Sequence, residues 1–320
     1  MKVDDIPDKI CDSAQAFLMG FVVIKIKPQK KDFAAWTECV SEDCDLLFIA
    51  EKDLGLLPKG VKALPAGKAK KNGKLWTLNN RSWYGYSINR RSHCASIKAG
   101  FLEKLPVIEL AALGKMQIEA KVPSLIRSSL LPTRIAKAAP LVGGHAWITA
   151  GVWRRLKKAE KIATMKAWFA QNELIHQPSI PIAKLPASVR TLIQKNKLDK
   201  ILHSFRSTSG GNCFATAAAF ATGNHKLLDQ WMLWTPLKKH LSKSGYRMIS
   251  FRERPKAEDI LIFQTKGNPV HAAIYLGEGV WFEKPGQDFY EPYRLVELRK
   301  WKKEWPGAKL TVFRKTDSSA

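Results

Sequence analysis

Three side chains in the C-terminal third of the chain have the types and spacing of a nucleophilic active site. The first is Cys213, which follows Gly210-Gly211-Asn212 and precedes an alanine-rich run that ends at Gly223. Asn is a favoured N-cap and Gly a favoured C-terminal residue, so we expect a short helix with Cys213 at its first position. There the helix macrodipole and the unpaired N–H groups favour a thiolate, and the same groups could hold the oxyanion of a tetrahedral intermediate.

The other two side chains belong to a predicted β-hairpin over residues 270–283. β-Branched and aromatic residues flank the turn signal Gly277-Glu278-Gly279. Side chains alternate between the faces of a strand, so a three-residue loop puts Ala273 opposite Glu283, with His271 one diagonal step away on the same face. A two-residue loop would turn Glu283 to the other face, so the prediction depends on the register.

These residues predict nucleophilic catalysis. His271 would take the proton of Cys213, the thiolate would attack an amide or ester carbonyl, and Glu283 would orient the imidazole. The acyl-enzyme would then be released to water or to another acceptor. Three further side chains are candidate substrate contacts, although Trp281 is equally suited to packing in the sheet: Asn212, Tyr275 and Trp281.

The order of these elements resembles the NlpC/P60 group of papain-like cysteine hydrolases. The match comprises a Cys at a helix start, the strand 258–263 beginning Glu-Asp, the strand His271-Ala-Ala-Ile-Tyr-Leu-Gly, and Glu283 twelve positions after the histidine. The usual Asp-Cys-Ser-Gly is Asn212-Cys213-Phe214-Ala215 here, and Ile201 stands where many members have a tyrosine. The third residue is more often His, Asn or Gln than Glu.

This resemblance implies a thiol protease or amidase that cuts a peptide bond in peptidoglycan stem peptides of the cell wall, with no cofactor and no metal. A transglutaminase-like acyl transferase, with Asp288 as the third residue seventeen positions after the histidine, is an alternative in the same enzyme class. A rival class is a basic binding protein for nucleic acid or an anionic envelope polymer, built on a degenerate hydrolase fold.

We expect an α+β chain with two domains. A basic α+β domain of unknown function would span residues 1–175, a linker marked by three prolines 176–196, and the papain-like domain 197–320. The predicted elements outside the site are strands at 45–50, 75–78, 82–88 and 310–313, a helix passing into a strand over 14–27, a loop at 59–74, and helices at 153–171 and 226–244.

The composition of the chain indicates which partners it could bind and where in the cell we expect it to be made. The chain has 320 residues, 45% of them hydrophobic, and a formal charge of +25. Such a field favours acidic peptides, peptidoglycan-type substrates, nucleic acid or other anionic polymers. The acidic N-terminus and the eight-residue apolar run 17–24 predict neither a secretory signal nor a transmembrane segment. We therefore expect synthesis in the cytoplasm, with any export by phage lysis or a dedicated secretion system.

The remaining cysteines and histidines offer two weaker constellations. The five cysteines form an odd set that is typical of reduced thiols. Cys39, Cys44, His93 and Cys94 have spacings seen in zinc sites, but adjacent ligands at 93 and 94 suit tetrahedral geometry poorly, so we expect ordinary buried thiols. Cys94 with His145 is a possible second Cys–His pair, but no carboxylate follows it at a useful distance.

Overall fold

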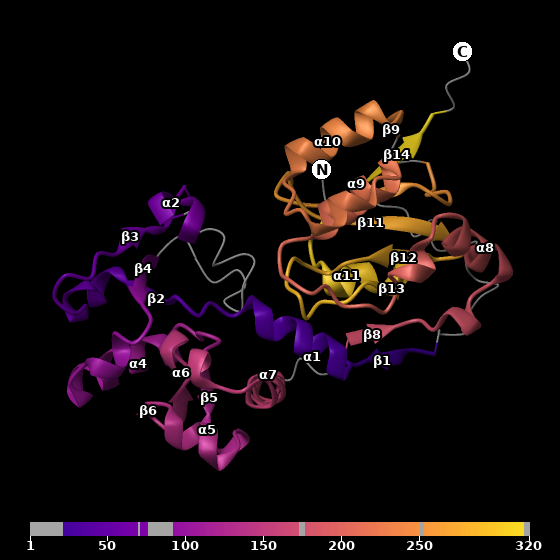
Figure 1. The fold of residues 1–320 in the computed structure, drawn as a ribbon. Helices are drawn as coiled ribbons and strands as arrows, with labels where there is room; N and C mark the ends of the chain where they lie inside the picture. Colours follow the sequence, from indigo (N-terminus) through magenta and orange to yellow (C-terminus); the bar gives the residue numbers. More distant parts are fainter. Residues whose placement is uncertain (1–21, 70, 76–91, 173–176, 250–252, 317–320) are drawn as a thin grey trace.

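The computed structural model describes residues 22–69, 71–75, 92–172, 177–249 and 253–316. These residues form helices and antiparallel sheets, as expected for an α+β chain. Figure 1 shows two lobes, with the indigo-to-magenta part of the chain in one and the orange-to-yellow part in the other. The described regions contain no helix with both the length and the apolar character needed to cross a membrane.

The N-terminal lobe is built on two small three-stranded sheets with the orders β2-β4-β3 and β5-β7-β6. Its elements are α1 (Lys30–Trp36), β2 (Cys44–Ala50), β3 (Leu64–Pro65), α2 (Ala66–Ala69), β4 (Ser92–Lys98), α4 (Val107–Glu119), β5 (Leu125–Arg127), α5 (Thr133–Ala138), β6 (Leu141–Val142), β7 (His145–Trp147), α6 (Ala150–Arg155) and α7 (Lys158–Gln171). The first strand, β1 (Ile24–Ile26), lies instead beside the C-terminal lobe, where it pairs with β8 (Gln177–Ser179) (Figure 1). The strand predicted at 45–50 is confirmed as β2.

The C-terminal lobe contains one six-stranded antiparallel sheet with the order β13-β12-β11-β10-β14-β9. Its elements are β8 (Gln177–Ser179), α8 (Ala187–Lys195), α9 (Cys213–Thr222), α10 (Trp234–Lys243), β9 (Tyr246–Met248), β10 (Ile260–Thr265), β11 (Asn268–Gly277), β12 (Val280–Glu283), β13 (Arg294–Glu297), α11 (Trp301–Glu304) and β14 (Lys309–Lys315). The final strand predicted at 310–313 lies within β14.

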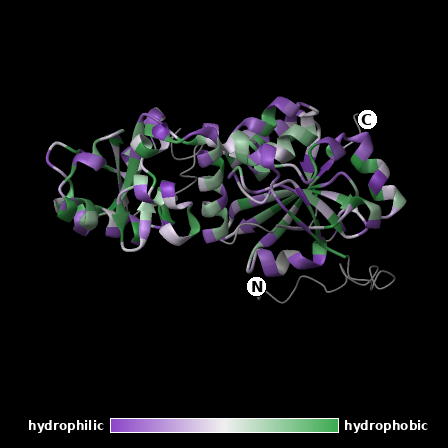
Figure 2. Cartoon of the chain, turned by 60° about the horizontal axis from the view of Figure 1, so that its bottom comes forward, coloured by the Kyte–Doolittle hydropathy of each residue, from purple (hydrophilic) through white to green (hydrophobic). Residues whose placement is uncertain are grey.

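Both faces of this sheet are buried. Ile262, Ile274 and Phe282 share one core with α8, α9 and α10, while Phe263 and Trp281, on the opposite face, belong to a second core. Figure 2 shows hydrophobic colour along the strands and hydrophilic colour on much of the outer helices. Successive apolar residues along β10, β11 and β12 therefore point to opposite faces of the sheet and pack alternately into the two cores.

The β11–β12 hairpin has the register that a three-residue loop predicts. Tyr275 pairs with Trp281 and Ile274 with Phe282, and the ladder is irregular between Tyr275 and Gly277. Gly277 and Gly279 both have positive φ, at 90° and 71°, which a glycine adopts without strain. Continuing this pairing puts Glu283 opposite Ala273, on the same face as His271.

The helix predicted at 226–244 is wrong, because the segment is divided. A 3-10 helix covers His225–Asp229 and α10 begins only at Trp234. Pro236 gives the reason: in a continuous helix it would lack the N–H for the carbonyl of Met232, four residues earlier, and its ring would clash there. At the third position of α10 the proline is tolerated, and the freed Met232 carbonyl accepts a hydrogen bond from Asn212 Nδ2 at 2.7 Å.

The segment predicted as a linker, residues 176–196, is folded from Gln177 onward. It forms β8, which pairs with β1, and α8, whose Val189 and Ile193 are buried in the core of the C-terminal lobe. The prolines that suggested a linker begin helices instead: Pro181 precedes a 3-10 turn and Pro186 is the N-cap residue of α8. Proline suits such positions because no intrahelical N–H bond is needed there.

Three other expectations in the N-terminal lobe need correction or fall outside the described residues. The single helix predicted at 153–171 is two helices, α6 and α7, because Lys157 is extended and its N–H bonds the Glu160 carboxylate to begin α7. The loop predicted at 59–74 includes the short β3 and α2. The strand at 82–88, nearly all of that at 75–78, and the helix before residue 22 lie outside the described residues.

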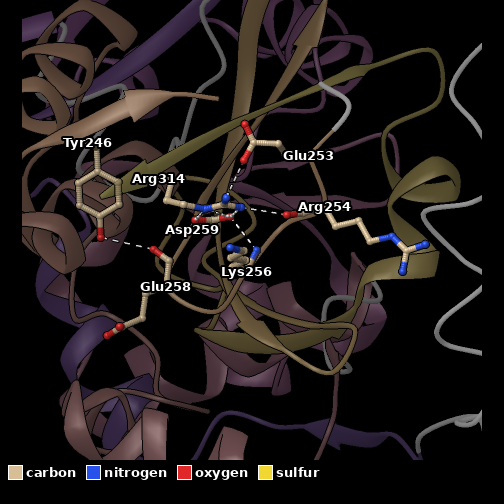
Figure 3. Close-up of polar contacts among 7 residues, drawn as sticks. All are labelled: Tyr246, Glu253, Arg254, Lys256, Glu258, Asp259 and Arg314. Carbon is tan, nitrogen blue, oxygen red and sulfur yellow. Dashed lines mark hydrogen bonds and ion pairs between the residues drawn. The ribbon is translucent and has the colours of Figure 1, made fainter. Parts of the chain in front are cut away.

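One polar cluster holds the start of β10 to the neighbouring strand β14. Arg314 donates to both carboxylate oxygens of Asp259, at 2.8 and 3.0 Å, and to Glu253 at 2.8 Å (Figure 3). The backbone N–H of Lys256 also donates to Asp259, which is buried. Asp259, which the sequence resemblance places in the strand before the histidine, therefore ties the start of β10 to β14, and β10 pairs on its other side with β11, the strand that carries His271.

Candidate active site

Cys213 is held at the first position of α9 by the loop that precedes it. Asn212 caps the helix, its side-chain oxygen accepting from the Ala215 N–H at 3.0 Å, and Gly223 ends it in the left-handed conformation. Gly211 packs so tightly that an added Cβ would lie 1.9 Å from the carbonyl oxygen of Leu228. The glycine loop and both helix ends are thus as predicted, and they place the sulfur beside the unpaired N–H groups of the first turn.

The predicted contact between His271 and Glu283 is present. Nε2 of His271 lies 2.7 Å from Oε2 of Glu283, and both side chains are fully buried. The other ring nitrogen, Nδ1, is buried with no hydrogen-bond partner of standard geometry among the described residues. One nitrogen of the imidazole is therefore oriented by the carboxylate, and the other is left for a different group.

The charge of Cys213 also acts on this imidazole. Burial alone would lower the pKa of His271, but the charge of Cys213, followed by that of Glu283, outweighs it and raises the pKa to about 10. The structure thus places His271 in direct contact with Glu283 and brings Cys213 within electrostatic range of the imidazole.

Glu283 is kept ionised by partners on both sides. Burial would raise its pKa, but His271 and Arg294 together lower it to about 2. Arg294 donates from Nε to Oε1 of Glu283 at 2.7 Å and from Nη2 to Glu304 at 2.7 Å. The charges alternate from His271 through Glu283 and Arg294 to Glu304, which offsets the cost of burying each of them.

Arg294, Glu304 and Trp305 are site residues that sequence reasoning missed. Arg294 stands directly opposite Glu283 in the β12–β13 ladder, so only the pairing of a third strand would have revealed it. Trp305, just after α11, stacks on the His271 ring with centroids 4.6 Å apart and 15° between planes. An indole face there excludes water from the imidazole and favours its charged form.

The candidate substrate contacts have structural roles in this conformation. Asn212 is occupied at both ends of its side chain, by Ala215 and by Met232. Trp281 is fully buried in the sheet core, and the hydroxyl of Tyr275 accepts from the Gly279 N–H at 3.1 Å, which braces the hairpin turn. Each of the three therefore supports the loop, sheet or turn on which the site is built.

The alternative third residue, Asp288, is engaged elsewhere. Its carboxylate accepts from the Tyr290 hydroxyl at 2.9 Å, whereas the imidazole is held by Glu283. Cys94 and His145, the possible second pair, lie on β4 and β7 in different sheets. Within the described ranges, no three His, Cys, Asp or Glu side chains gather as metal ligands.

Cys213 is buried, and the cavity that lies along α9 is lined by later residues of that helix and not by Cys213. Cys213 is only 6% exposed. A cavity of about 190 Å³ runs beside the same helix, between α8, α9 and the 3-10 helix that follows α9. Thr216, one turn after Cys213, contributes to its wall, and so do Phe282 and the basic side chains of Lys195 and Lys197.

Comparison of the chain with protein-family models, with curated proteins and with solved structures finds no match in any of the three. The functional interpretation consequently depends on the geometry of the site. A thiol at a helix N-terminus, an imidazole with one free nitrogen and a buried carboxylate that orients it are the parts that nucleophilic acyl transfer needs.

Proposed function

We propose that this chain is a cysteine-nucleophile hydrolase, a peptidase or amidase, whose residues 197–320 form an NlpC/P60-type domain with a papain-like fold. Cys213 attacks the carbonyl as a thiolate, the His271 imidazolium donates a proton to the leaving amine, and the N–H groups at the start of α9 hold the oxyanion. Water then releases the acyl group, and Glu283 keeps the imidazole in orientation throughout.

A single observation carries this proposal: the imidazole of His271 is bound through Nε2 to Glu283, and it interacts electrostatically with Cys213. A histidine with a purely structural role needs neither a reactive partner nor a buried counter-charge. The proposed substrate is an acidic peptide of the peptidoglycan stem type, because a chain with a net charge of +25 attracts anionic polymers.

Mass spectrometry of purified peptidoglycan fragments tests the proposal. We expect the wild-type protein to produce new peptide termini in the fragments and Cys213→Ala to produce none. Cys94→Ala is the matched control, because it removes another buried thiol, on β4, and leaves the three proposed catalytic residues in place. Equal cleavage by the wild type and Cys213→Ala would exclude Cys213 as the nucleophile.

The charge of +25 also favours a second function, a basic binding protein for nucleic acid or an anionic envelope polymer. In that case affinity survives Cys213→Ala unchanged and falls steeply as salt is raised, and no fragment is cleaved. Titration of both proteins with a single-stranded oligonucleotide and with wall polymer at two salt concentrations separates the two functions.

A further inference from the structure

The segment that leads into Cys213, residues 206–212, is bonded to the N-terminal lobe. We call this segment the nucleophile loop. The indole N–H of Trp36, the last residue of α1, donates to the Arg206 carbonyl at 2.7 Å. The thiol of Cys39, one helical turn later, donates to the Ser207 carbonyl at 2.9 Å. Both donors are buried, so two carbonyls of the loop take their hydrogen bonds from the other lobe.

The nucleophile loop is also bonded to residues 284–290, which follow β12 and which we call the strap. The N–H of Gly210 donates to the Gln287 carbonyl at 2.8 Å, and the N–H of Phe289 donates to Ser209 Oγ at 3.0 Å. The strap keeps its shape because the buried ammonium of Lys284 donates to the two carbonyls that flank that of Gln287, at 2.6 and 2.9 Å. Loop and strap therefore form one hydrogen-bonded unit.

Trp36 contacts both parts of this unit. Its ring lies 4.9 Å from that of Phe289 in the strap and 5.5 Å from that of Phe205, which immediately precedes the loop, measured between centroids. On the N-terminal side it stacks on Phe169 of α7, at 4.9 Å and 9° between planes. The indole is fully buried in a core that contains residues of both lobes. Its ring thus packs on the strap while its N–H bonds the loop.

The nucleophile loop has little rigidity of its own. It contains the adjacent residues Gly210 and Gly211, and Gly210 has a φ of 133° that a glycine adopts readily. In the proposed mechanism this loop sets the position of Cys213 and of the N–H groups at the start of α9. A displacement of about 1 Å can lower the rate of such a reaction roughly 100-fold. The position of the loop must therefore be imposed by its partners.

We propose that the N-terminal lobe positions the nucleophile loop, and that Trp36 and Cys39 are the positioning residues through which it does so. This inference deepens the proposed function and rests on Cys213 being its nucleophile. It gives the N-terminal lobe a part in the reaction, as a support of the site and not as a separate module.

Hydrogen–deuterium exchange of the full-length protein, followed by mass spectrometry of its peptides, tests this inference. Trp36→Phe keeps an aromatic ring and removes the indole N–H. We expect exchange in the peptide that covers 206–212 to become about fivefold faster, the effect of one hydrogen bond, and exchange in β10 and β11 to stay at the wild-type rate. Trp147→Phe is the matched control, because Trp147 is a buried indole in a core formed by residues 47–147.

Cleavage of peptidoglycan fragments provides a readout that a purely structural role would not change. We expect Trp36→Phe to lower kcat about tenfold, because the loop and its N–H groups are displaced, and to leave KM within about twofold of the wild type. The control Trp147→Phe should retain the wild-type kcat.

Two results would overturn the inference: wild-type exchange of the loop in Trp36→Phe, or an equal acceleration in Trp147→Phe or in β10 and β11, which would indicate loss of global stability only. If Trp36→Phe does not fold, the two variants Cys39→Ala and Cys39→Ser replace it. Alanine removes the donor to Ser207 and should accelerate exchange of the loop about twofold, whereas serine keeps a donor and should restore the wild-type rate. Equal rates in these two variants would refute the role of the lobe.

The exchange measurement requires no substrate, so its failure is distinguishable from failure of the proposed function. Faster exchange of the loop in Trp36→Phe without cleavage of fragments by the wild type would retain the support of the loop and reject the hydrolase. Cleavage by the wild type, together with wild-type loop exchange and kcat in Trp36→Phe, would retain the hydrolase and reject the role of the N-terminal lobe.

Discussion

Replacement of Glu283 by glutamine tests how much the buried ion pairs of Glu283 with His271 and Arg294 stabilise the fold. The pKa of Glu283 is about 2 in the folded chain, against an ordinary value of 4.5. At 1.36 kcal/mol per pKa unit, this difference corresponds to about 3 kcal/mol of stability at neutral pH. Loss of one member of a buried ion pair costs a similar amount, ~3–5 kcal/mol. We therefore expect Glu283→Gln to lower the free energy of unfolding by about 3 kcal/mol.

The stability contributed by Glu283 is expected to depend on pH, and the direction follows from its lowered pKa. Because the folded pKa lies below the unfolded value, the stabilisation by Glu283 is complete above pH 4.5 and is lost as the pH falls toward 2. The difference between the wild type and Glu283→Gln should thus be largest at neutral pH and shrink as the pH falls from 4.5 to 3. Urea unfolding followed by tryptophan fluorescence measures it at each pH.

Glu278→Gln is the matched control, since Glu278 is exposed at the turn of the same hairpin. Its removal should change stability by less than about 0.5 kcal/mol, as is usual for a surface substitution. The reasoning is refuted if Glu283→Gln is as stable as Glu278→Gln at pH 7, or if the loss does not change as the pH falls from 4.5.

Two further predictions concern the thiols and the histidine. Burial, aided by Glu38 and Cys44 respectively, raises the pKa of Cys39 and of Cys94 to about 12, so iodoacetamide at pH 7 should modify Cys213 well before either of them; equal rates measured by peptide mass spectrometry would contradict this. The pKa of His271 is raised from 6.5 to about 10, so its stabilisation is complete below pH 6.5 and is lost as the pH rises through 10. The stability difference between the wild type and His271→Gln in urea unfolding should accordingly shrink over that range, and a difference that grows toward pH 10 would show that the histidine is not held as a cation.

The parts of the site that could be predicted from the sequence are those encoded by neighbouring residues. Asn212 and Gly223 mark the two ends of α9 because capping depends on side chains and backbone conformations within one turn. The turn residues 277–279 set the hairpin register, and with it the shared face of His271 and Glu283, because side chains alternate with a period of two.

Local sequence patterns gave wrong predictions where one residue type is compatible with two structures. The three prolines at 178–186 are typical of a linker, yet two of them begin helical turns that pack into the C-terminal core. Apolar residues have helical spacing on both sides of Pro236, but this spacing carries no information about the missing proline N–H, which divides the segment. In both cases tertiary packing or a single steric constraint outweighed the pattern.

The sequence by itself determined where the thiol, the imidazole and the carboxylate stand along the chain, since each depends on a cap, a turn or a strand period. Only the tertiary structure decided what surrounds them. Arg294 reaches Glu283 from the third strand, β13, and Trp305, which follows α11, stacks on the His271 ring. Such contacts join residues with no common local signal, because packing and charge pairing act through space and not along the chain.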